Sequence, residues 1–186
     1  MTTLAYRKSV LAGLLVACFA PFGWGQTTTV RNFLVASGYI CDLVANECPA
    51  TEKAADGGTV EINGVGNFTT PANTIAATGA YTTRDSSGVK LDDGLWTATS
   101  LVSYKSYGVD QNTPPREGGL AQMNIQLFSD FGGAPINAVL YVNCSDGNPP
   151  KGFTKDFIKL NITGGESYST YVRAVTVYTP LPATIP

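Results

Sequence analysis

Two pairs of carboxylates are the residues of this chain whose types and spacing could perform catalysis. Asp92 and Asp93 are adjacent, and Glu61 with Asp85 forms a second conceivable pair. One protonated and one ionised carboxyl group can together hydrolyse a glycosidic bond. However, Asp92 and Asp93 precede a glycine and Asp85 opens a Ser-Ser-Gly segment, so turn formation explains these residues. We therefore assign no catalytic residue, and a carboxylate-based carbohydrate-active enzyme is only an alternative.

Metal and cofactor chemistry finds little support in the sequence. Histidine is absent, which removes the commonest general base and metal ligand and rules out a Ser-His-Asp arrangement. Asp130 and Asp146 lie in glycine-containing segments and offer oxygen ligands for calcium, but neither spacing matches an EF-hand loop. The sequence therefore predicts no metal site and no cofactor.

Aromatic residues are the remaining candidates for a binding site. Tyr104, Tyr107, Phe131 and Tyr168 lie near the ends of expected strands. At such positions their rings could stack on sugars or line the mouth of a cavity. Core filling and cross-strand pairing are the competing explanation. We name these four as candidate ligand-facing residues and expect Trp96 to lie in the core.

The overall composition excludes some classes of partner. The chain has 186 residues, 12 of them Lys or Arg and 14 Asp or Glu, with a formal net charge of −2. This length suits one domain with one core. The clustered basic residues that nucleic acid or an acidic membrane surface would require are not found in the sequence. The expected partner is an unidentified surface or small-molecule ligand.

Residues 1–25 have the three parts of an export signal. Arg7 and Lys8 form a basic start, an apolar run follows as far as Ala20, and small residues end the segment. The apolar run is too short to span a bilayer as a mature helix, so no transmembrane span is expected. The sequence predicts a secreted or periplasmic protein. Alternatively, Cys18 ends a Leu-Val-Ala-Cys segment similar to the bacterial lipobox, and its lipidation would anchor the protein at the cell envelope.

Three cysteines follow the signal. In an exported protein the neighbouring pair, Cys41 and Cys48, is expected to oxidise to a disulfide. By the loop-entropy model, so short a ring contributes roughly 2 to 3 kcal/mol. Cys144 is then either a buried thiol within a strand or a partner for one of the other two.

The clearest structural signal is the alternation between Leu120 and Phe128. Apolar residues recur at every second position, from Ala121 to Leu127, with polar residues between them. This period is typical of a strand with one buried and one solvated face. Similar signals predict further strands at 27–36, 59–63, 75–83, 95–104, 138–144, 158–162 and 171–178.

Gly, Pro, Asn and Asp residues separate these segments. Turns are expected at Gly64–Gly66 and Asp92–Gly94, and surface connections at 49–58 and 110–119. Residues 180–186 contain three prolines and are expected to form a flexible tail. The pattern predicts a single all-β domain over residues 26–179, built as an antiparallel β-sandwich or closed β-barrel of about eight to ten strands.

Several short motifs carry a resemblance to known proteins. They are Gly79-Ala80-Tyr81, Gly94-Leu95-Trp96-Thr97-Ala98, Ser103-Tyr104 with Tyr107-Gly108, Gly118-Gly119-Leu120 and Val142-Asn143-Cys144. Over roughly 59–162 the chain resembles a group of exported, uncharacterised bacterial β-rich proteins. That resemblance implies a bacterial exported origin and brings no catalytic or binding residues with it.

Taken together, these patterns predict an exported, non-enzymatic β domain that acts in surface recognition or as part of the cell envelope. The export signal, the expected disulfide, the all-β pattern and the lack of a convergent reactive set motivate this hypothesis. A small apolar ligand-binding β-barrel is the second hypothesis, since the aromatic content would suit an apolar cavity.

Overall fold

The computed structural model describes residues 28–110 and 115–181. The predicted signal, residues 1–25 with Cys18, lies outside the described residues. One short helix, α1 (Tyr39–Leu43), and one 3-10 turn, η1 (Ala45–Glu47), interrupt a chain that is otherwise built of strands. The strands are β1 (Thr29–Val35), β2 (Ala50–Lys53), β3 (Thr59–Thr70), β4 (Ile75–Arg84), β5 (Lys90–Asp110), β6 (Arg116–Ser129), β7 (Ile136–Cys144), β8 (Phe157–Ile162), β9 (Ser167–Tyr168), β10 (Thr170–Arg173) and β11 (Thr176–Leu181).

All of the recorded strand pairings are antiparallel, which confirms the predicted all-β class. The pairings β3–β4, β4–β5, β5–β6, β6–β11, β11–β1 and β1–β3 form a closed circuit. Strands β7, β8 and β9 extend the sheet from β6, and β2 and β10 extend it from β3. The weakest link of the circuit joins β11 to β6 through one residue pair, Tyr178 with Glu117.

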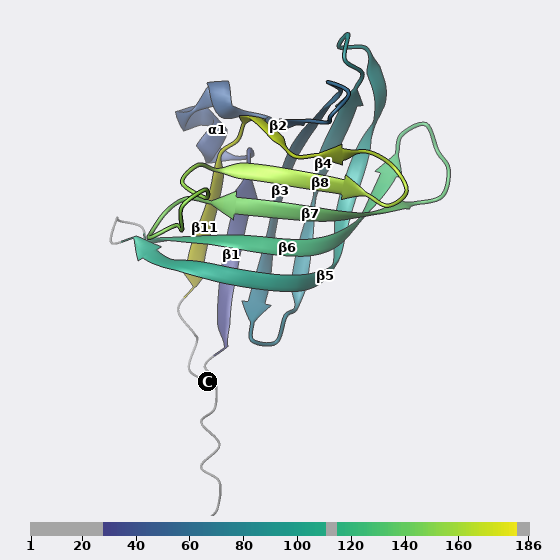
Figure 1. Cartoon of the computed structure of the whole chain (residues 1–186). Helices are drawn as coiled ribbons and strands as arrows, with labels where there is room; N and C mark the ends of the chain where they lie inside the picture. The colour runs from purple at the N-terminus through teal and green to yellow at the C-terminus, as the bar shows by residue number, and fades with distance from the viewer. Residues whose placement is uncertain (1–27, 111–114, 182–186) are drawn as a thin grey trace, which may run out of the picture.

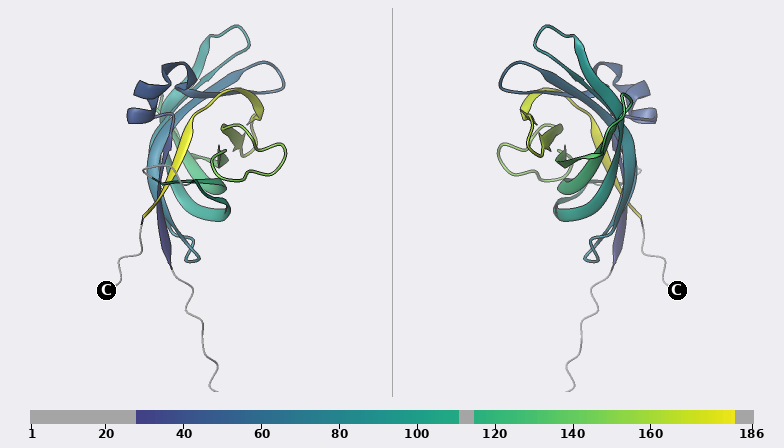
Figure 2. Two further views of the ribbon diagram at one scale, coloured as in Figure 1. Left: turned by 90° about the vertical axis from the view of Figure 1, so that its left-hand side faces the viewer. Right: turned by 90° about the vertical axis from the view of Figure 1, so that its right-hand side faces the viewer.

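The sheet bends into two layers that face each other across the core. Strands β6, β7 and β8 cross the front of the molecule in Figure 1, while β1, β3 and β4 run steeply behind them. The side views show the same curvature (Figure 2). Strand β5 pairs with β4 in its first part and with β6 along most of its length, and three register shifts interrupt its pairing with β6. Such bulges bend a strand, so β5 can turn the corner between the layers.

The core lies between these layers and confirms the alternation seen in the sequence. Ala121, Met123, Ile125 and Leu127 of β6 are each at most 2% exposed. Trp96 is fully buried, as predicted, and its indole Nε1 donates a hydrogen bond to the carbonyl oxygen of Asn63 at 2.9 Å. Burial of these apolar side chains is the main driving force for folding.

The predicted turn at Gly64–Gly66 is wrong, because β3 continues through it. A Cβ on Gly64 would overlap the Trp96 ring, and a Cβ on Gly79 of the neighbouring strand would meet the backbone of β3. These glycines therefore mark the close approach of an indole ring to two strands. A glycine within a strand often has this role.

Two further expectations about β5 are corrected. Asp92 and Asp93 form no turn, since β5 begins at Lys90 and passes through both. Strict alternation along the strand predicted at 95–104 would place Val102 on the core side with Trp96, yet Val102 is 43% exposed and Leu101 is buried instead. The register shift between Ala98 and Ser100 exchanges the two faces of the strand at this point.

The expectations for 49–58 and for the C-terminal end are corrected as well. Residues Ala50–Lys53 form strand β2 between β3 and β10, where its tertiary contacts override a polar composition. The single strand expected over 171–178 is divided into β10 and β11. In the flexible tail predicted over 180–186, Pro180 and Leu181 instead belong to β11 and pair with Arg31 and Val30, and residues 182–186 lie outside the described residues.

Candidate functional site

The carboxylates that the sequence singled out are held by structural contacts. Asp92 accepts hydrogen bonds from the hydroxyls of Tyr81 at 2.7 Å and Ser129 at 2.5 Å, and so ties β4 to β5 and β6. Asp93 forms an ion pair with Lys90 at 2.9 Å. The Asp92 contacts hold neighbouring strands together, and the Asp93 ion pair lies within β5.

The second pair does not form a convergent site either. Glu61 lies 3.8 Å from Arg84, on the surface of the sheet. Asp85 accepts hydrogen bonds from Ser87 and Val89 and closes the β4–β5 turn. Sequence reasoning also missed a Ser-x-x-Lys spacing in this turn, from Ser87 to Lys90. The Ser87 hydroxyl donates to Asp85 at 2.7 Å, so the spacing reflects turn formation.

The four aromatic residues named from the sequence lie in different places. Tyr104 belongs to a core cluster, Tyr107 is only 8% exposed, and Tyr168 is buried. Phe131 is 72% exposed after β6, beneath the ammonium group of Lys90. The structure does not bring them together at one mouth.

The interior holds what we call the closed cluster, the rings of Phe33, Phe68, Tyr104 and Tyr178. Ring centroids within it are 4.8 to 6.1 Å apart, at distances typical of favourable aromatic pairs. The guanidinium carbon of Arg31 lies 4.8 Å from the centroid of the Tyr104 ring. Large side chains thus fill the centre of the molecule.

Arg31 and Glu117 form a buried ion pair beside the closed cluster. Arg31 Nε donates to Glu117 Oε2 at 2.7 Å, and Nη2 donates to Oε1 at 3.1 Å. The Ser106 hydroxyl donates to Glu117 Oε1 at 2.5 Å, and Arg31 Nη1 donates to the Thr70 hydroxyl at 2.7 Å. Both carboxylate oxygens therefore have partners, as a buried charge requires.

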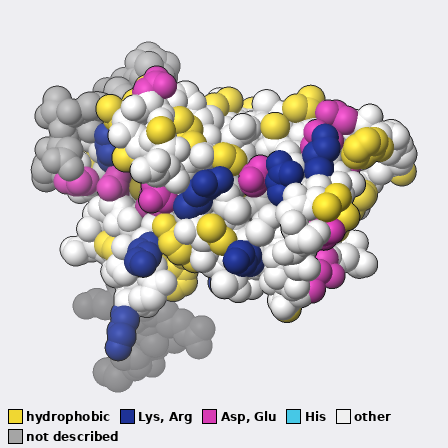
Figure 3. Space-filling view, turned by 90° about the horizontal axis from the view of Figure 1, so that it is seen from above, with side chains coloured by type: hydrophobic (Ala, Val, Ile, Leu, Met, Phe, Trp, Pro, Cys, Tyr) yellow, Lys and Arg dark blue, Asp and Glu magenta, His cyan; other side chains and the backbone are white. Residues whose placement is uncertain are grey.

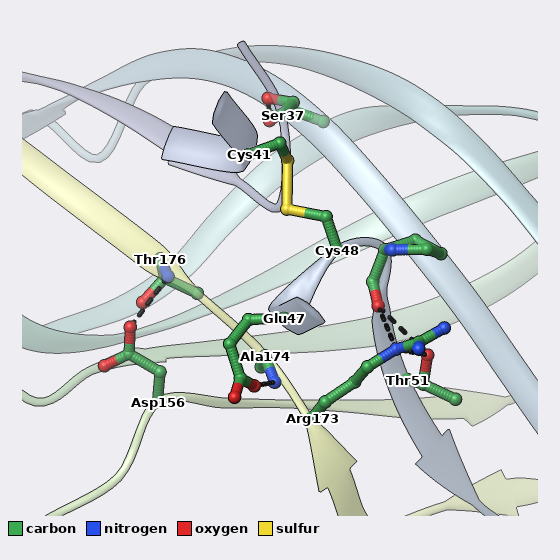
Figure 4. The surroundings of a disulfide bond; sticks show 11 residues. Ser37, Cys41, Glu47, Cys48, Thr51, Asp156, Arg173, Ala174 and Thr176 are labelled. Atoms are coloured by element: carbon green, nitrogen blue, oxygen red, sulfur yellow. Dashed lines mark hydrogen bonds between the residues drawn. A yellow bond between two sulfur atoms is a disulfide. The ribbon is translucent and has the colours of Figure 1, made fainter. Parts of the chain in front are cut away.

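The predicted disulfide between Cys41 and Cys48 is present, with sulfurs 2.08 Å apart (Figure 4). It joins α1 to the end of η1, just before β2, next to a cleft of about 420 Å³ whose lining includes Glu47, Asp146 and Asp156. In Figure 4, Glu47 accepts a hydrogen bond from the backbone of Ala174, and so fastens this segment to the strand β10–β11 connection.

Asp156 is a half-buried acid of this cleft, and its bonds are structural. Its Oδ1 accepts from the Ser145 amide at 2.8 Å and the Ser145 hydroxyl at 2.9 Å, and its Oδ2 accepts from the Thr176 amide at 2.7 Å. Burial raises its pKa despite these bonds. Cys144 is a buried free thiol among the described cysteines, and burial raises its pKa to about 12. Its thiolate, the reactive form, is therefore disfavoured.

A second depression, the aromatic groove, lies between β8 and β10. It consists of two adjoining hollows of about 380 and 170 Å³ that share Phe153, Phe157, Lys159 and Ser169. The larger hollow continues over β6, β7 and β8 and is also lined by Leu120, Tyr141 and Asn161. The smaller one is also lined by Glu52, Gly152 and Tyr171. Ring faces and polar groups are thus combined in one concave surface, as in many ligand sites.

Asn143 holds the loop that forms one wall of this groove. Its side-chain amide donates to the carbonyl oxygens of Phe153 at 3.2 Å and Lys155 at 2.8 Å. The Tyr107 hydroxyl donates to the Asn143 side-chain oxygen at 2.9 Å. The Phe153 ring contacts the rings of Tyr107 and Phe157, with centroids 6.2 and 5.8 Å apart. Buried hydrogen bonds therefore position the loop and its phenylalanine.

Glu52 lies at the inner end of the groove. It alternates with Ala50 of β2 and with Ala54 just after the strand, which both belong to the core, so its side chain points inward, and it is only 1% exposed. Its Oε1 accepts a hydrogen bond from the Ile158 amide of β8 at 3.3 Å. Its Oε2 has no hydrogen-bond partner within the part of the chain that the structure describes. Burial raises the pKa of Glu52 from 4.5 to about 7, against the opposing effects of the Ile158 amide and the charge of Lys159.

The Oε2 atom of Glu52 is unusual, because a buried polar atom without a hydrogen-bond partner costs free energy. Sequence reasoning missed Glu52 because residues 49–58 read as a surface connection. One available signal was the Ala-Thr-Glu-Lys-Ala segment, in which Glu52 alternates with two alanines and would therefore lie on the same face of a strand as they do.

Seen from above, hydrophobic side chains in the lower half of the view lie between Lys and Arg side chains (Figure 3).

Comparison of the chain with protein-family models, curated proteins and solved structures finds no match. Within residues 28–110 and 115–181, no group of three His, Cys, Asp or Glu side chains is placed to hold a metal ion. In the same residues, no helix has the length and apolarity that crossing a membrane would require.

Proposed function

We propose that this protein is an exported, non-enzymatic recognition domain that binds a small ligand in the aromatic groove. The observation that carries the proposal is Glu52, a carboxyl group whose Oε2 has no protein partner among the described residues and which lines a hollow with Phe153, Phe157 and Tyr171. Binding sites are where a fold tolerates such a group, because the ligand supplies the missing bond.

Recognition in the groove fits better than the other two hypotheses. The closed cluster fills the interior, which weighs against an apolar ligand held at the centre of the sheet. Asp92, Asp93 and Asp85 are engaged in strand and turn contacts, which weighs against a carboxylate-based enzyme. The groove instead offers ring faces with a few polar groups, which is the usual composition of a ligand site.

Export and architecture belong to the same proposal. The signal pattern at 1–25 and a disulfide, which persists in oxidising compartments, support a secreted or periplasmic location. Lipid anchoring through Cys18 is the alternative. Between a sandwich and a barrel we favour the barrel, because the strand pairings close a circuit. The resemblance to exported bacterial β-rich proteins stays a prediction.

Native mass spectrometry of the protein purified from its own host tests the proposal. We expect a retained small molecule with the parent chain, and its loss in Ser169→Trp, because an indole at this exposed position would fill the part shared by both hollows. Thr170→Trp is the matched control, since Thr170 is also exposed and is not part of the groove lining. Equal retention by both variants would overturn the proposal.

A further inference from the structure

We propose that the aromatic groove binds a sugar unit that carries a carboxylate. The ligand carboxylate would lie beside Lys159, and one ligand oxygen would accept a hydrogen bond from Glu52. This inference rests on the proposed function and names the class of ligand. The observations that carry it are the charges around the groove, the buried Oε2 of Glu52 that has no partner among the described residues, and the mixture of ring faces with polar groups.

The charges around the groove favour an anion. The ammonium nitrogen of Lys159 lies 5.5 Å from the Phe157 ring centroid, and that of Lys155 lies 5.5 Å from the Tyr171 centroid. An organic cation, the other class of ligand that aromatic faces attract, would meet a like charge at both rings. An anion would instead gain the attraction of Lys159, which lines both hollows.

The protonation of Glu52 supports the same conclusion. Its pKa of about 7 leaves a large protonated fraction at neutral pH. In that form the carboxyl group can donate a hydrogen bond while Oε1 still accepts from Ile158. An anionic oxygen placed against Oε2 would stabilise the protonated form further, because a nearby negative charge raises the pKa of a carboxyl group.

The charged and titratable groups around Glu52 come from each neighbouring element. Strand β8 supplies Lys159, whose charge lowers the pKa of Glu52. Strand β10 places Tyr171 opposite Glu52, and burial raises the pKa of this tyrosine. Strand β3 places the uncharged Val60 opposite it. Within the described lining of the two hollows Glu52 is the one acid, so an anion meets no second carboxylate there.

The remaining lining suits a sugar ring better than a purely apolar acid. Phe153 and Phe157 offer ring faces, and Asn161, Ser169 and the tyrosines offer hydrogen-bonding groups. The hollows of about 380 and 170 Å³ lie at or below the lower end of the range for drug-sized ligands. A ligand of one or two sugar units is therefore expected.

Isothermal titration calorimetry with digalacturonic acid tests this inference, with its methyl ester as the uncharged counterpart. The acid should bind the parent protein more tightly than the ester. Its affinity should be about tenfold higher near pH 6 than near pH 8, since only the protonated fraction of Glu52 donates the bond. Equal affinity for acid and ester, or affinity for the acid that rises with pH, would overturn the inference.

Two variants separate the contribution of Glu52 to ligand affinity from that of Lys159. Glu52→Gln keeps an acceptor for Ile158 and donates at every pH, so the acid should bind it with no pH dependence over this range. Lys159→Gln should bind the acid about fivefold more weakly and the ester unchanged. Lys90→Gln is the matched control, because Lys90 also lies over an exposed ring, Phe131, but outside the groove. If Lys90→Gln lowers the affinity for the acid as much as Lys159→Gln does, Lys159 is not the residue that attracts the ligand carboxylate.

Failure of this inference can be told from failure of the proposed function. If the ester or benzoate binds better than the acid, and Ser169→Trp abolishes that binding, the groove is a binding site for a different class of ligand. If Ser169→Trp and Thr170→Trp retain the same molecules equally, the groove is not the binding site at all.

Discussion

Glu117 and Glu52 are two buried carboxylates of one sheet, and they differ in how fully the protein satisfies them. Glu117 is 3% exposed and accepts two bonds from Arg31 and one from Ser106. Glu52 is 1% exposed and accepts one bond, from Ile158, at 3.3 Å. The aromatic surroundings differ in the same way, because the closed cluster is sealed by its own rings and the aromatic groove is open to solvent on one side.

Under the proposed function, this difference separates an acid that holds strands together from an acid that contacts a ligand. A buried ion pair with all oxygens satisfied holds strands in register, and here it lies where β11 and β6 share one residue pair. A buried acid with one oxygen that lacks a hydrogen-bond partner lowers the stability of the fold, and such groups are tolerated at functional sites. Burial alone therefore does not distinguish the two acids, whereas incomplete hydrogen bonding beside a concave surface does.

The largest expected difference in unfolding free energy is between removing a ring from the closed cluster and removing one from the aromatic groove. Phe68→Ala should lower the free energy of unfolding by about 4 kcal/mol, because it opens a cavity in the closed cluster. Phe157→Ala should cost about 1 to 2 kcal/mol, since its ring is only half-buried. Urea unfolding measures both. Equal costs would show that the groove ring is part of the core.

Removing the cation from the paired acid should have the next largest effect. Arg31→Leu leaves Glu117 buried without its counter-charge and should cost about 3 to 4 kcal/mol. The double variant Arg31→Leu/Glu117→Leu should recover a large part of that loss, because no lone charge is left. Urea titrations of the three proteins provide the comparison, and a double variant as unstable as the single one would contradict it.

Replacing Glu52 by an uncharged residue should raise the free energy of unfolding, whereas Arg31→Leu lowers it. The pKa of Glu52 is raised from 4.5 to about 7, so its contribution to stability is present below about pH 4.5 and is lost as pH rises through 7. Glu52→Gln should therefore be more stable than the parent near pH 8 by up to about 3 kcal/mol. Near pH 4 the two should be equal.

Guanidinium unfolding at both pH values measures this effect. Glu61→Gln is the control, because Glu61 lies at the surface near Arg84 and Arg173. The same pH slope in the parent and in Glu52→Gln would show that the carboxyl group titrates normally.

The smallest expected effect concerns the wall of the groove. Tyr107→Phe removes the donor to Asn143, which positions the loop through Phe153 and Lys155, and should cost about 1 kcal/mol. Tyr104→Phe in the closed cluster should cost more, because its hydroxyl interacts with the buried carboxylate of Glu117 as well as with the Gly118 carbonyl at 3.3 Å. Thermal unfolding compares them, and a smaller loss for Tyr104→Phe would contradict this contrast.

The short-range patterns were sufficient for the class of fold and for much of the core. Alternation over Leu120–Phe128 predicted which side chains of β6 are buried, since side chains of a strand alternate between its two faces. The pairing of Cys41 with Cys48 followed from proximity in sequence. Local patterns failed at Gly64, Asp92 and Val102, where glycines and aspartates read as turns and a bulge exchanged the faces of β5.

The chain itself thus determines that it forms antiparallel strands with one apolar face, because that property depends on residues two positions apart. The groove depends on contacts between residues far apart in sequence. Glu52 and Ile158 are 106 positions apart, and Tyr107 and Asn143 are 36 apart. Whether a carboxylate is satisfied depends on every donor within about 3 Å of it, and only the tertiary structure brings those donors together or leaves one oxygen without them.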